Sequence, residues 1–517
     1  MYSNKENVNI LTALLVAHGV KHAVCCPGSR NSPIVHNLNA CPDITCYPVT
    51  DERSAGFYAL GMSLCLQEPV VVCVTSGTAL LNLAPAVAEA YYQHIPLVVV
   101  SADRPQAWID QLYGQTLPQP DALGRFVRKA VSLVEPHNEE ECWYCNRLVN
   151  EVLMNKHAPV HINVPISEPL FDYSVEHLPK ERKIELLPAD ISNTTLTHVC
   201  RMFMQAKRPM LIAGQPMNPH LDEAVLLVGD DEDYVPDFVL YTGDSIVSKR
   251  VKHFLRKAKD TWAVNETGEV NDTFMNLTHV IQGDGKIVAD MVRFNLEQQS
   301  HPFVQKWQQL LDDVQQFAEA YQPTYSQMAV VKCFERRQSV ARSQYHYANS
   351  SAIRLANIYA QHFVYCNRGV NGIEGSLSTA AGFSCVTDGK VFCVIGDLSF
   401  FYDQNALWNQ NLRGNLRILL LNNGKGGIFN MLKGLEQSPA RDKFVAAEHH
   451  TSAEGICLQN HITYLKAENM EQMQQGVDTL LYIESERPVL LEVFTDPEED
   501  ERAFRDYYRK LQERDTN

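Results

Sequence analysis

Residues 391–399 read Val391-Phe392-Cys393-Val394-Ile395-Gly396-Asp397-Leu398-Ser399, and this stretch decides the fold class. An apolar run of strand length ends in Gly-Asp, and helix-type spacing follows it. Backbone N–H groups at such a strand-to-helix turn, together with the positive end of the helix, can bind a phosphate. The Asp397 carboxylate adds a ligand for a hard cation that bridges to this phosphate. The stretch therefore predicts an α/β fold with an anion and metal site at a strand end.

A second apolar run, Leu416–Leu421, leads into Asn422-Asn423-Gly424-Lys425-Gly426-Gly427. Both turns should lie at the carboxyl ends of neighbouring parallel strands, where open α/β sheets bind ligands. Asp and Asn side chains, a main-chain carbonyl, two diphosphate oxygens and water would complete an octahedral Mg²⁺ shell, which Mn²⁺ also accepts. Either turn alone could be an ordinary turn. Their combination favours a metal–diphosphate site.

The rest of the chain repeats this alternation of strand-sized apolar runs and helical spacing. Predicted strands are His22–Cys26, Ile44–Val49, Val70–Val74, Leu97–Val100, Pro159–Pro165, Pro209–Gly214, Phe238–Gly243, Thr278–Gly283 and Pro488–Phe494. Predicted helices are Ser32–Leu38, Glu52–Leu66, Thr78–Tyr92, Val304–Tyr321, Ser376–Phe383, Phe400–Asn411 and a solvated tail, Asp496–Asn517. We expect three domains, 1–180, 190–325 and 340–517, each a mostly parallel sheet flanked by helices. The middle one looks shortened, because 215–237 shows few signals.

Bulk composition excludes several classes of protein. The chain has 517 residues, 45% of them hydrophobic and 21% charged, as in ordinary globular proteins. A net charge of −16 argues against nucleic acid or an anionic membrane as a partner. There is no apolar run of membrane-spanning length and no secretory signal, so we expect a cytoplasmic protein. The 14 cysteines, including the Cys142/Cys145 pair, are interpreted as structural, and so are His449 and His450.

The paired turns resemble the thiamine-diphosphate (ThDP) binding motif of the ThDP-dependent enzyme superfamily. The resemblance implies metal ligands at Asp397, Asn423 and the Lys425 main-chain oxygen, with Gly396, Leu398 and Ser399 on the diphosphate side. It also requires a glutamate from another domain. Glu52, in Asp51-Glu52-Arg53-Ser54-Ala55-Gly56, fits this role as the acid that hydrogen-bonds the aminopyrimidine ring. Taken alone, a glutamate at this position would more often be a first-turn residue favoured by the helix dipole.

Further motifs resemble one family within this superfamily. These are Pro27–Pro33, Asp51–Ser54, Thr75–Ala79, Ala102–Pro105, Asn367–Gly375 and Leu377–Gly382. They are similar to the signatures of the MenD family, the 2-succinyl-5-enolpyruvyl-6-hydroxy-3-cyclohexene-1-carboxylate (SEPHCHC) synthases of menaquinone biosynthesis. The resemblance implies an N-terminal pyrimidine-binding, a central and a C-terminal diphosphate-binding domain. It also implies decarboxylation of 2-oxoglutarate and 1,4-addition of the remaining succinyl-semialdehyde unit to isochorismate.

Both of these substrates are dicarboxylates, which bidentate arginines suit. By resemblance, the isochorismate side is contacted by Arg30, Arg104, Gln115, Lys249 and Arg354, and Arg368 lies near the 2-oxoglutarate-derived carboxylate. Ser29, Ile428 and Phe429 would line the same cavity. Thr78, Ser350, Gly372 and Ile373 would contact the cofactor, Gly372 through its carbonyl and Ile373 as the bulky residue beneath it. Taken alone, any one of the arginines could instead form a surface ion pair, and Ile373 could equally be an ordinary core residue.

Two features depart from the family pattern: residue 114, and the middle block over 215–237, which is shorter than the family's equivalent. Gly114 stands where the family usually has Asn before the glutamine matched by Gln115. A ThDP enzyme with another donor or acceptor, or a catalytically silent ThDP-fold or nucleotide-binding protein, remains an alternative. The arginine cluster argues against the former, and the combination of Glu52, Asp397 and Asn423 against the latter. Because Glu52 and Asp397 fall in different domains, we expect a homodimer or homotetramer with active sites shared between chains.

Overall fold

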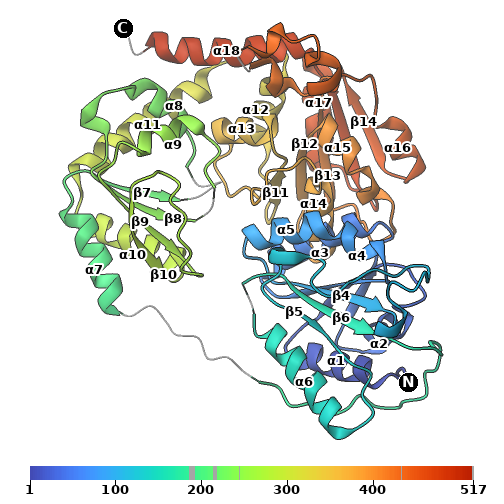
Figure 1. Cartoon of the computed structure of the whole chain (residues 1–517). Coiled ribbons are helices and arrows are strands. Elements are labelled where there is room, and N and C mark those ends of the chain that lie inside the picture. Colours follow the sequence, from blue (N-terminus) through green and yellow to red (C-terminus); the bar gives the residue numbers. More distant parts are fainter. Residues whose placement is uncertain (156, 185–192, 214–217, 244, 432–433, 515–517) are drawn as a thin grey trace.

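Three parallel sheets follow one another along the chain in the computed structural model, which describes residues 1–155, 157–184, 193–213, 218–243, 245–431 and 434–514 (Figure 1). All strand pairs within the three sheets are parallel, and helices flank each sheet. The expected fold class is confirmed. No helix in the described ranges is long and apolar enough to cross a membrane.

The N-terminal sheet has the order β2-β1-β3-β4-β6-β5. Its strands are β1 (His22–Cys25), β2 (Thr45–Pro48), β3 (Val70–Val74), β4 (Leu97–Asp103), β5 (Ala130–Ser132) and β6 (Val160–Pro165). Its helices are α1 (Glu6–Ala17), α2 (Ser32–Ala40), α3 (Glu52–Leu66), α4 (Thr78–Asn82), α5 (Ala84–Tyr92) and α6 (Glu139–Leu153). Every residue of β3 and β4 is buried, as expected for central parallel strands. The helix predicted over 78–92 is interrupted at Leu83, because Pro85 lacks an N–H and therefore stands in the first turn of a new helix, which begins at Ala84.

The middle sheet has the order β10-β9-β8-β7. Its strands are β7 (Pro209–Ala213), β8 (Phe238–Thr242), β9 (Asp260–Asn265) and β10 (Leu277–Gln282). Its helices are α7 (Asn193–Gln205), α8 (Leu221–Val228), α9 (Lys249–Leu255), α10 (Gly285–Gln298) and α11 (Pro302–Ala320). The low signal over 215–237 was misleading for its described part, because α8 forms there and buries Leu221, Ala224 and Val225 in the core. Residues 214–217 and 185–192 lie outside the described ranges.

The C-terminal sheet has the order β11-β12-β13-β15-β14. Its strands are β11 (Gln344–Tyr347), β12 (Val391–Gly396), β13 (Leu416–Asn422), β14 (Thr463–Ala467) and β15 (Val489–Phe494). Its helices are α12 (Gln327–Arg337), α13 (Ser351–Tyr359), α14 (Ser376–Cys385), α15 (Asp397–Tyr402), α16 (Glu454–Gln459), α17 (Met470–Tyr482) and α18 (Pro497–Arg514). Gly396 pairs with Leu421, so the two predicted turns do follow neighbouring strands.

Two helices of the C-terminal part differ from the prediction. The helix expected over 400–411 begins earlier, at Asp397, and ends at Tyr402, after which a short 3₁₀ turn covers Gln404–Leu407. The tail helix, α18, is not fully solvated: it buries Ala503, Tyr507 and Leu511. These three residues lie at helical spacing of four, a periodicity that the dense charges around them obscured.

The N-terminal and C-terminal parts pack together through α3 and α14 (Figure 1). Glycines allow the two backbones to approach closely. A Cβ added to Gly61 would lie 2.0 Å from the Thr379 carbonyl oxygen, and one added to Gly382 would lie 2.2 Å from that of Tyr58. Apolar residues of both parts share one hydrophobic cluster. The two turns that carry Asp397 and Glu52 are therefore held in one compact body.

Candidate active site

The Asp397 carboxylate joins the two predicted turns. Its Oδ1 accepts a hydrogen bond from its neighbour, the Leu398 N–H, at 2.7 Å. Its Oδ2 accepts from the N–H groups of Asn423 at 3.1 Å and Gly424 at 2.8 Å. The side chain is almost fully buried, and His449 Nε2 lies 3.5 Å from the same oxygen. A carboxylate bound by several backbone N–H groups is held in one orientation, as a metal ligand must be.

The second turn is shaped by glycine and by side-chain hydrogen bonds. Gly424 has φ +76°, which L-residues rarely adopt, and a Cβ there would lie 2.8 Å from the His449 carbonyl oxygen. The amide Nδ2 of Asn423 donates to Asp500 Oδ2 at 2.9 Å, and its Oδ1 accepts a long hydrogen bond from the Lys425 N–H at 3.4 Å. The neighbouring Asn422 is bound to the buried Glu492 at 2.8 Å. Asn422 is therefore structural, whereas Asn423 keeps its oxygen toward the turn.

These residues fit the expected metal and diphosphate. One carboxylate, one amide oxygen and a main-chain carbonyl form an oxygen-only donor set, the kind that Mg²⁺ binds. An added Cβ on Gly396 would meet nothing within 4 Å, so the backbone at the strand end faces open space. No group of three or more His, Cys, Asp or Glu side chains in the described ranges could hold a metal.

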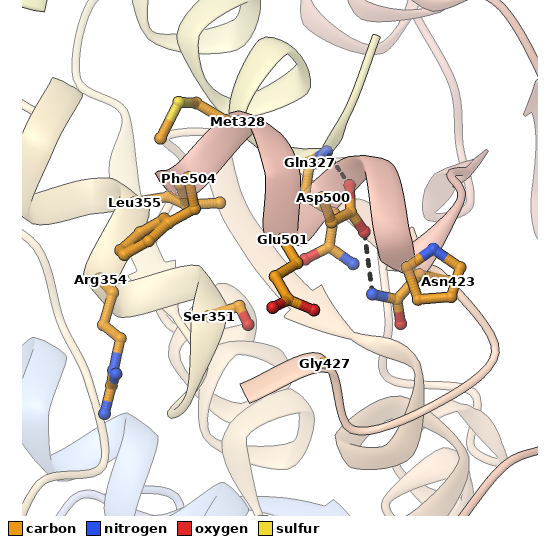
Figure 2. A pocket seen from close by; sticks show the side chains of 11 residues that line it. Gln327, Met328, Ser351, Arg354, Leu355, Asn423, Gly427, Asp500, Glu501 and Phe504 are labelled. Atoms are coloured by element: carbon orange, nitrogen blue, oxygen red, sulfur yellow. Dashed lines mark hydrogen bonds between the residues drawn. The ribbon is translucent and has the colours of Figure 1, made fainter. Parts of the chain in front are cut away.

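A cavity lies between α13, α18 and the second turn (Figure 2). It holds about 40 Å³ and is lined by Gln327, Met328, Ser351, Arg354, Leu355, Asn423, Gly427, Pro497, Asp500, Glu501 and Phe504. Figure 2 shows the Glu501 carboxylate projecting between Ser351 and Asn423. The Arg354 side chain points away from the two acids, Asp500 and Glu501. The cavity connects the metal turn to Arg354, whose pKa is lowered by burial. It thus joins two groups of residues that the sequence analysis assigned separately.

The loop before α14 carries three predicted site residues, and Asn349 holds it in place. Asn349 Nδ2 donates to the carbonyls of Asn367 at 2.7 Å and Gly372 at 2.9 Å. Its Oδ1 accepts from Arg368 Nη1 at 3.0 Å. The next residue, Ser350, has φ +75°, a conformation that costs energy in a non-glycine residue. Asn349 was not predicted, because no local pattern distinguishes it from any other polar residue after a strand.

The same loop is also bound from the N-terminal part. Glu89 of α5 is 3% exposed, and its two carboxylate oxygens accept from the N–H groups of Gly369 and Val370, each at 2.7 Å. Burial raises the pKa of Glu89, and these backbone hydrogen bonds oppose that rise. Ile373, a few residues further on, is 43% exposed. The loop is therefore anchored at its start by another domain while Ile373 stays accessible.

Arg30 and Arg104 form a basic pair in the N-terminal part. Arg30 is 5% exposed, donates to the Ile166 carbonyl at 2.8 Å and pairs with Glu168 at 3.2 Å. Burial, and then the charge of Arg104, lower the pKa of Arg30. Ser29 lies beside this pair in the chain. A buried guanidinium, that of Arg30, and a partly buried one, that of Arg104, lie close enough to repel each other, and such a pair favours an anionic ligand.

The Gln115 backbone lies close to Gly77, the residue before Thr78. A Cβ on Gly77, which has φ +89°, would lie 3.2 Å from the Gln115 backbone. The fully buried Gln119 accepts from the Gly77 N–H at 2.7 Å and donates to Asn163 at 2.8 Å. Gln119 thus fixes the loop that carries Gln115. Its role could not be read from the sequence, since its partners come from three separate strands and turns.

Glu52 is the first residue of α3, and its carboxyl forms no hydrogen bond or ion pair with any described residue. Its neighbours are engaged across the interface: Asp51 accepts from Asn405 at 2.7 Å, and Arg53 donates to the Tyr402 carbonyl at 2.8 Å. Burial, and then the charge of Glu52, raise the pKa of the nearby Cys26 thiol. Both flanking residues are fixed, so the Glu52 backbone is fixed while its carboxyl remains available.

Lys249 begins α9 after the cap residue Ser248. Burial, followed by the charges of Arg368 and Lys249, lowers the pKa of Lys252, so Lys252 of α9 lies near Arg368. Arg250 is paired with Asp222 at 2.7 Å. Ile428 and Phe429 lie in the 3₁₀ turn that follows Gly426. Three of the predicted residue groups, around Asp397, Arg354 and Arg368, are thus brought near one another.

The predicted site residues of the N-terminal part are not linked to the groups around Asp397, Arg354 and Arg368. In the part of the chain that the structure describes, no hydrogen bond or ion pair links Ser29, Arg30, Arg104 or Gln115 to Asp397, Asn423, Arg354 or Arg368. Of the residues that were interpreted as structural, His449 lies against Asp397 and so belongs to the site's surroundings. Cys142 and Cys145 lie on α6, where the buried Cys145 donates to the Val134 carbonyl.

Comparison with protein families now identifies the class. The family described as thiamine pyrophosphate enzyme, N-terminal TPP binding domain, matches residues 6–123, and the corresponding C-terminal TPP binding domain matches 349–493. Together with the Asp397–Asn423 site, these matches define a ThDP-dependent enzyme. The predicted cofactor is confirmed.

Relatives that match over the full length identify the family within this class of enzymes. The chain is 42% identical to the 2-succinyl-5-enolpyruvyl-6-hydroxy-3-cyclohexene-1-carboxylate synthase of Bacteroides thetaiotaomicron, over 99% of this chain and 100% of the relative. It is 43% identical to that of Bacteroides fragilis, with 99% and 100% covered, and 33% identical to that of Flavobacterium johnsoniae, with 96% and 97% covered. The chain belongs to the SEPHCHC synthase family, as its motifs predicted. The alignment with the first relative spans 560 positions against 517 residues here, so that relative has residues without a counterpart in this chain.

Proposed function

We propose that this chain decarboxylates 2-oxoglutarate and adds the remaining succinyl-semialdehyde unit to isochorismate in a 1,4-addition, which yields SEPHCHC and CO₂. The observation that carries the proposal is the Asp397 carboxylate, which three backbone N–H groups hold against the Asn423 turn. Full-length similarity to synthases of this name supports the choice of substrates. When bound, ThDP supplies a nucleophilic carbon that activates the 2-oxo acid.

The chain's own residues bind and orient the cofactor. Asp397, Asn423 and the Lys425 carbonyl would hold Mg²⁺ or Mn²⁺, and Gly396, Leu398, Ser399, Thr78 and Ser350 would surround the cofactor. Glu52 would hold a proton at the aminopyrimidine ring, a role for which its free carboxyl is suited. The Gly372 carbonyl, whose position Asn349 fixes, would accept a hydrogen bond from the ring amine. The accessible Ile373 would support the cofactor from below.

Two basic groups would bind the substrates. Arg368, held by Asn349, would bind the carboxylate derived from 2-oxoglutarate. Isochorismate would be bound by Arg30, Arg104, Gln115, Lys249 and Arg354, with Ser29, Ile428 and Phe429 lining the cavity. Arg30 and Arg104 repel each other even though Glu168 pairs with Arg30, and this repulsion supports an anionic ligand at that place. Binding of dicarboxylates would relieve it.

We further propose domains at 1–180, 190–325 and 340–517, and a cytoplasmic homodimer or homotetramer. Each proposed domain contains one of the three sheets. The lack of any link between the Arg30–Arg104 group and the Asp397 group within the described ranges supports active sites shared between chains. Sedimentation analysis of the purified protein tests the oligomer, and a monomer that is fully active would contradict it.

The assay follows 2-oxoglutarate consumption with and without isochorismate and identifies the product by mass. We expect isochorismate-dependent CO₂ release that requires ThDP and a divalent cation. Turnover of pyruvate without a response to isochorismate would instead establish the alternative, a ThDP enzyme with another donor and acceptor.

A further inference from the structure

The proposed metal site uses the side-chain amide of Asn423 as a ligand. The two ends of this amide, its oxygen and its NH₂ group, are nearly equal in size. Only the Asn423 oxygen can bind a metal, whereas its NH₂ group would repel one. A neighbouring group must therefore determine which end of the amide points toward the metal site. In the structure the NH₂ group donates to Asp500 Oδ2 at 2.9 Å, an interaction drawn as a dashed line in Figure 2. A carboxylate accepts hydrogen bonds and donates none, so it selects this orientation.

Asp500 is itself held in place from both sides. The Thr495 hydroxyl donates to its Oδ2 at 2.9 Å, and the Gln327 N–H at the start of α12 donates to its Oδ1 at 2.7 Å. It stands in the first turn of α18, which docks separately through the buried Ala503, Tyr507 and Leu511. The carboxylate is thus fixed by three donors, of which Asn423 is the one that leads to the metal site.

We propose that Asp500 is a positioning residue for the metal site: by accepting from the Asn423 NH₂ group, it turns the Asn423 oxygen toward the cation. This inference rests on the proposed role of Asn423 as a ligand. Asp500 lies beyond residues 349–493, the range that matches the C-terminal TPP binding domain, so the match assigns it nothing. Partners that orient a metal ligand commonly change metal affinity about 10- to 100-fold when they are removed.

A merely structural role must be distinguished from this one. Asp500 also caps α12 through Gln327, so its loss could act through stability alone. The measurement is therefore binding: calorimetric titration of ThDP into the full-length protein at fixed Mg²⁺, and of Mg²⁺ at fixed ThDP, alongside the Tm without either. An Asn at position 500 must turn an NH₂ group toward either Asn423 or Gln327, whereas Asp500→Glu keeps the acceptor.

For Asp500→Asn we expect Mg²⁺-dependent ThDP binding to weaken about 10- to 100-fold with a Tm shift of only a few degrees, and Asp500→Glu to recover part of the affinity. Glu498→Gln, an exposed acid on the same helix, and Thr495→Val, which removes another donor to the same carboxylate, should bind ThDP within about threefold of wild type. Asn423→Ala should weaken binding at least as much as Asp500→Asn, and the two losses should not add in the double variant.

The outcomes separate the inference from the proposed function. Wild-type affinity in Asp500→Asn with weak binding in Asn423→Ala would overturn the positioning role and leave the metal assignment standing. Wild-type affinity in Asn423→Ala would overturn the assignment itself. If Asp500→Asn does not fold, Asp500→Glu decides alone: we expect a stable protein with affinity lowered by less than tenfold, and equal loss in Thr495→Val would indicate a structural role.

Discussion

The turns at Asp397 and Glu52 follow the same pattern, since each carboxylate opens a helix just after a parallel strand. Their surroundings differ. Asp397 accepts three backbone hydrogen bonds that its own domain supplies, whereas Glu52 has none within the described part of the chain. A carboxylate already bound by the fold is suited to hold a cation, because its orientation costs nothing on binding. A carboxyl left free is suited to exchange a proton with a ligand.

The largest effect is expected at Asp397. Asp397→Ala should weaken Mg²⁺-dependent ThDP binding by about 100-fold or more, because it removes the charged ligand and the link between the two turns. Calorimetry measures the affinity and CO₂ release the activity. Asp388→Ala, a fully exposed acid before β12, is the matched control. ThDP affinity unchanged in Asp397→Ala would mean that the two turns do not form the cofactor site.

Glu52→Gln should behave in the opposite way. We expect ThDP affinity close to wild type and a loss of about 10²- to 10⁴-fold in turnover, since proton transfer is removed and the fold is untouched. Glu68→Gln serves as the control. Glu68 lies just after the C-terminal end of α3, and its partner is the surface residue Lys21. If Glu52→Gln lost binding and turnover equally, the contrast with Asp397 would disappear.

Arg104→Met should raise KM for isochorismate about 10- to 100-fold with a smaller change for 2-oxoglutarate. One charge-assisted hydrogen bond contributes about 1.5–3 kcal/mol, which corresponds to this range. Steady-state kinetics with each substrate varied in turn provides the measurement, with the exposed Arg128→Met as control. An equal rise in KM for both substrates would show that Arg104 does not distinguish them.

The N-terminal and the C-terminal part of the molecule each bury a neutral histidine. Burial lowers the pKa of His161 to about 4 and that of His346 to about 3. Because the unfolded residues titrate near 6.5, the unfolded chain binds more protons between these values, and the free energy of unfolding should fall as the pH drops below about 6.5. We expect each histidine to account for about 1–2 kcal/mol between pH 7 and pH 5.

Urea unfolding at several pH values tests this. His161→Gln and His346→Gln should each flatten part of the pH dependence, whatever they do to the stability at pH 7. A slope that stays unchanged in both variants would mean that carboxylates dominate the acid lability. Separate transitions, one altered by each variant, would show that the two parts unfold independently.

Glu89→Gln is expected to have the smallest effect. A glutamine can accept from one of the two N–H groups of Gly369 and Val370 but must turn its NH₂ toward the other. The loss should be about 1 kcal/mol, seen as a lower Tm and a kcat/KM for 2-oxoglutarate reduced about fivefold through the Arg368 loop. Gln93→Ala, which removes a donor to the same carboxylate, is the control. Kinetics at wild-type level would show that the loop is positioned without α5.

Local patterns were sufficient for the two strand-end turns. The apolar runs before Asp397 and Asn423 identified parallel strands, and the rule that ligands bind at carboxyl strand ends predicted their meeting. The same local approach missed α8 and the buried face of α18, where dense charges masked the helical period. It also missed Glu89, Asn349, Gln119 and Asp500. Each of these binds backbone or side chains far away in the chain, and such contacts leave no pattern in the residues beside them.

By itself, the sequence determined the α/β class, the cofactor and the family, because strand periodicity and turn motifs are properties of short segments. Only the tertiary structure decided what each carboxylate contacts. The packing of α3 against α14 and of α18 over the Asn423 turn brings distant residues within hydrogen-bonding distance. That packing separates an Asp397 bound by its own fold from a Glu52 that remains free, a difference that no motif contains, since both residues follow the same local pattern.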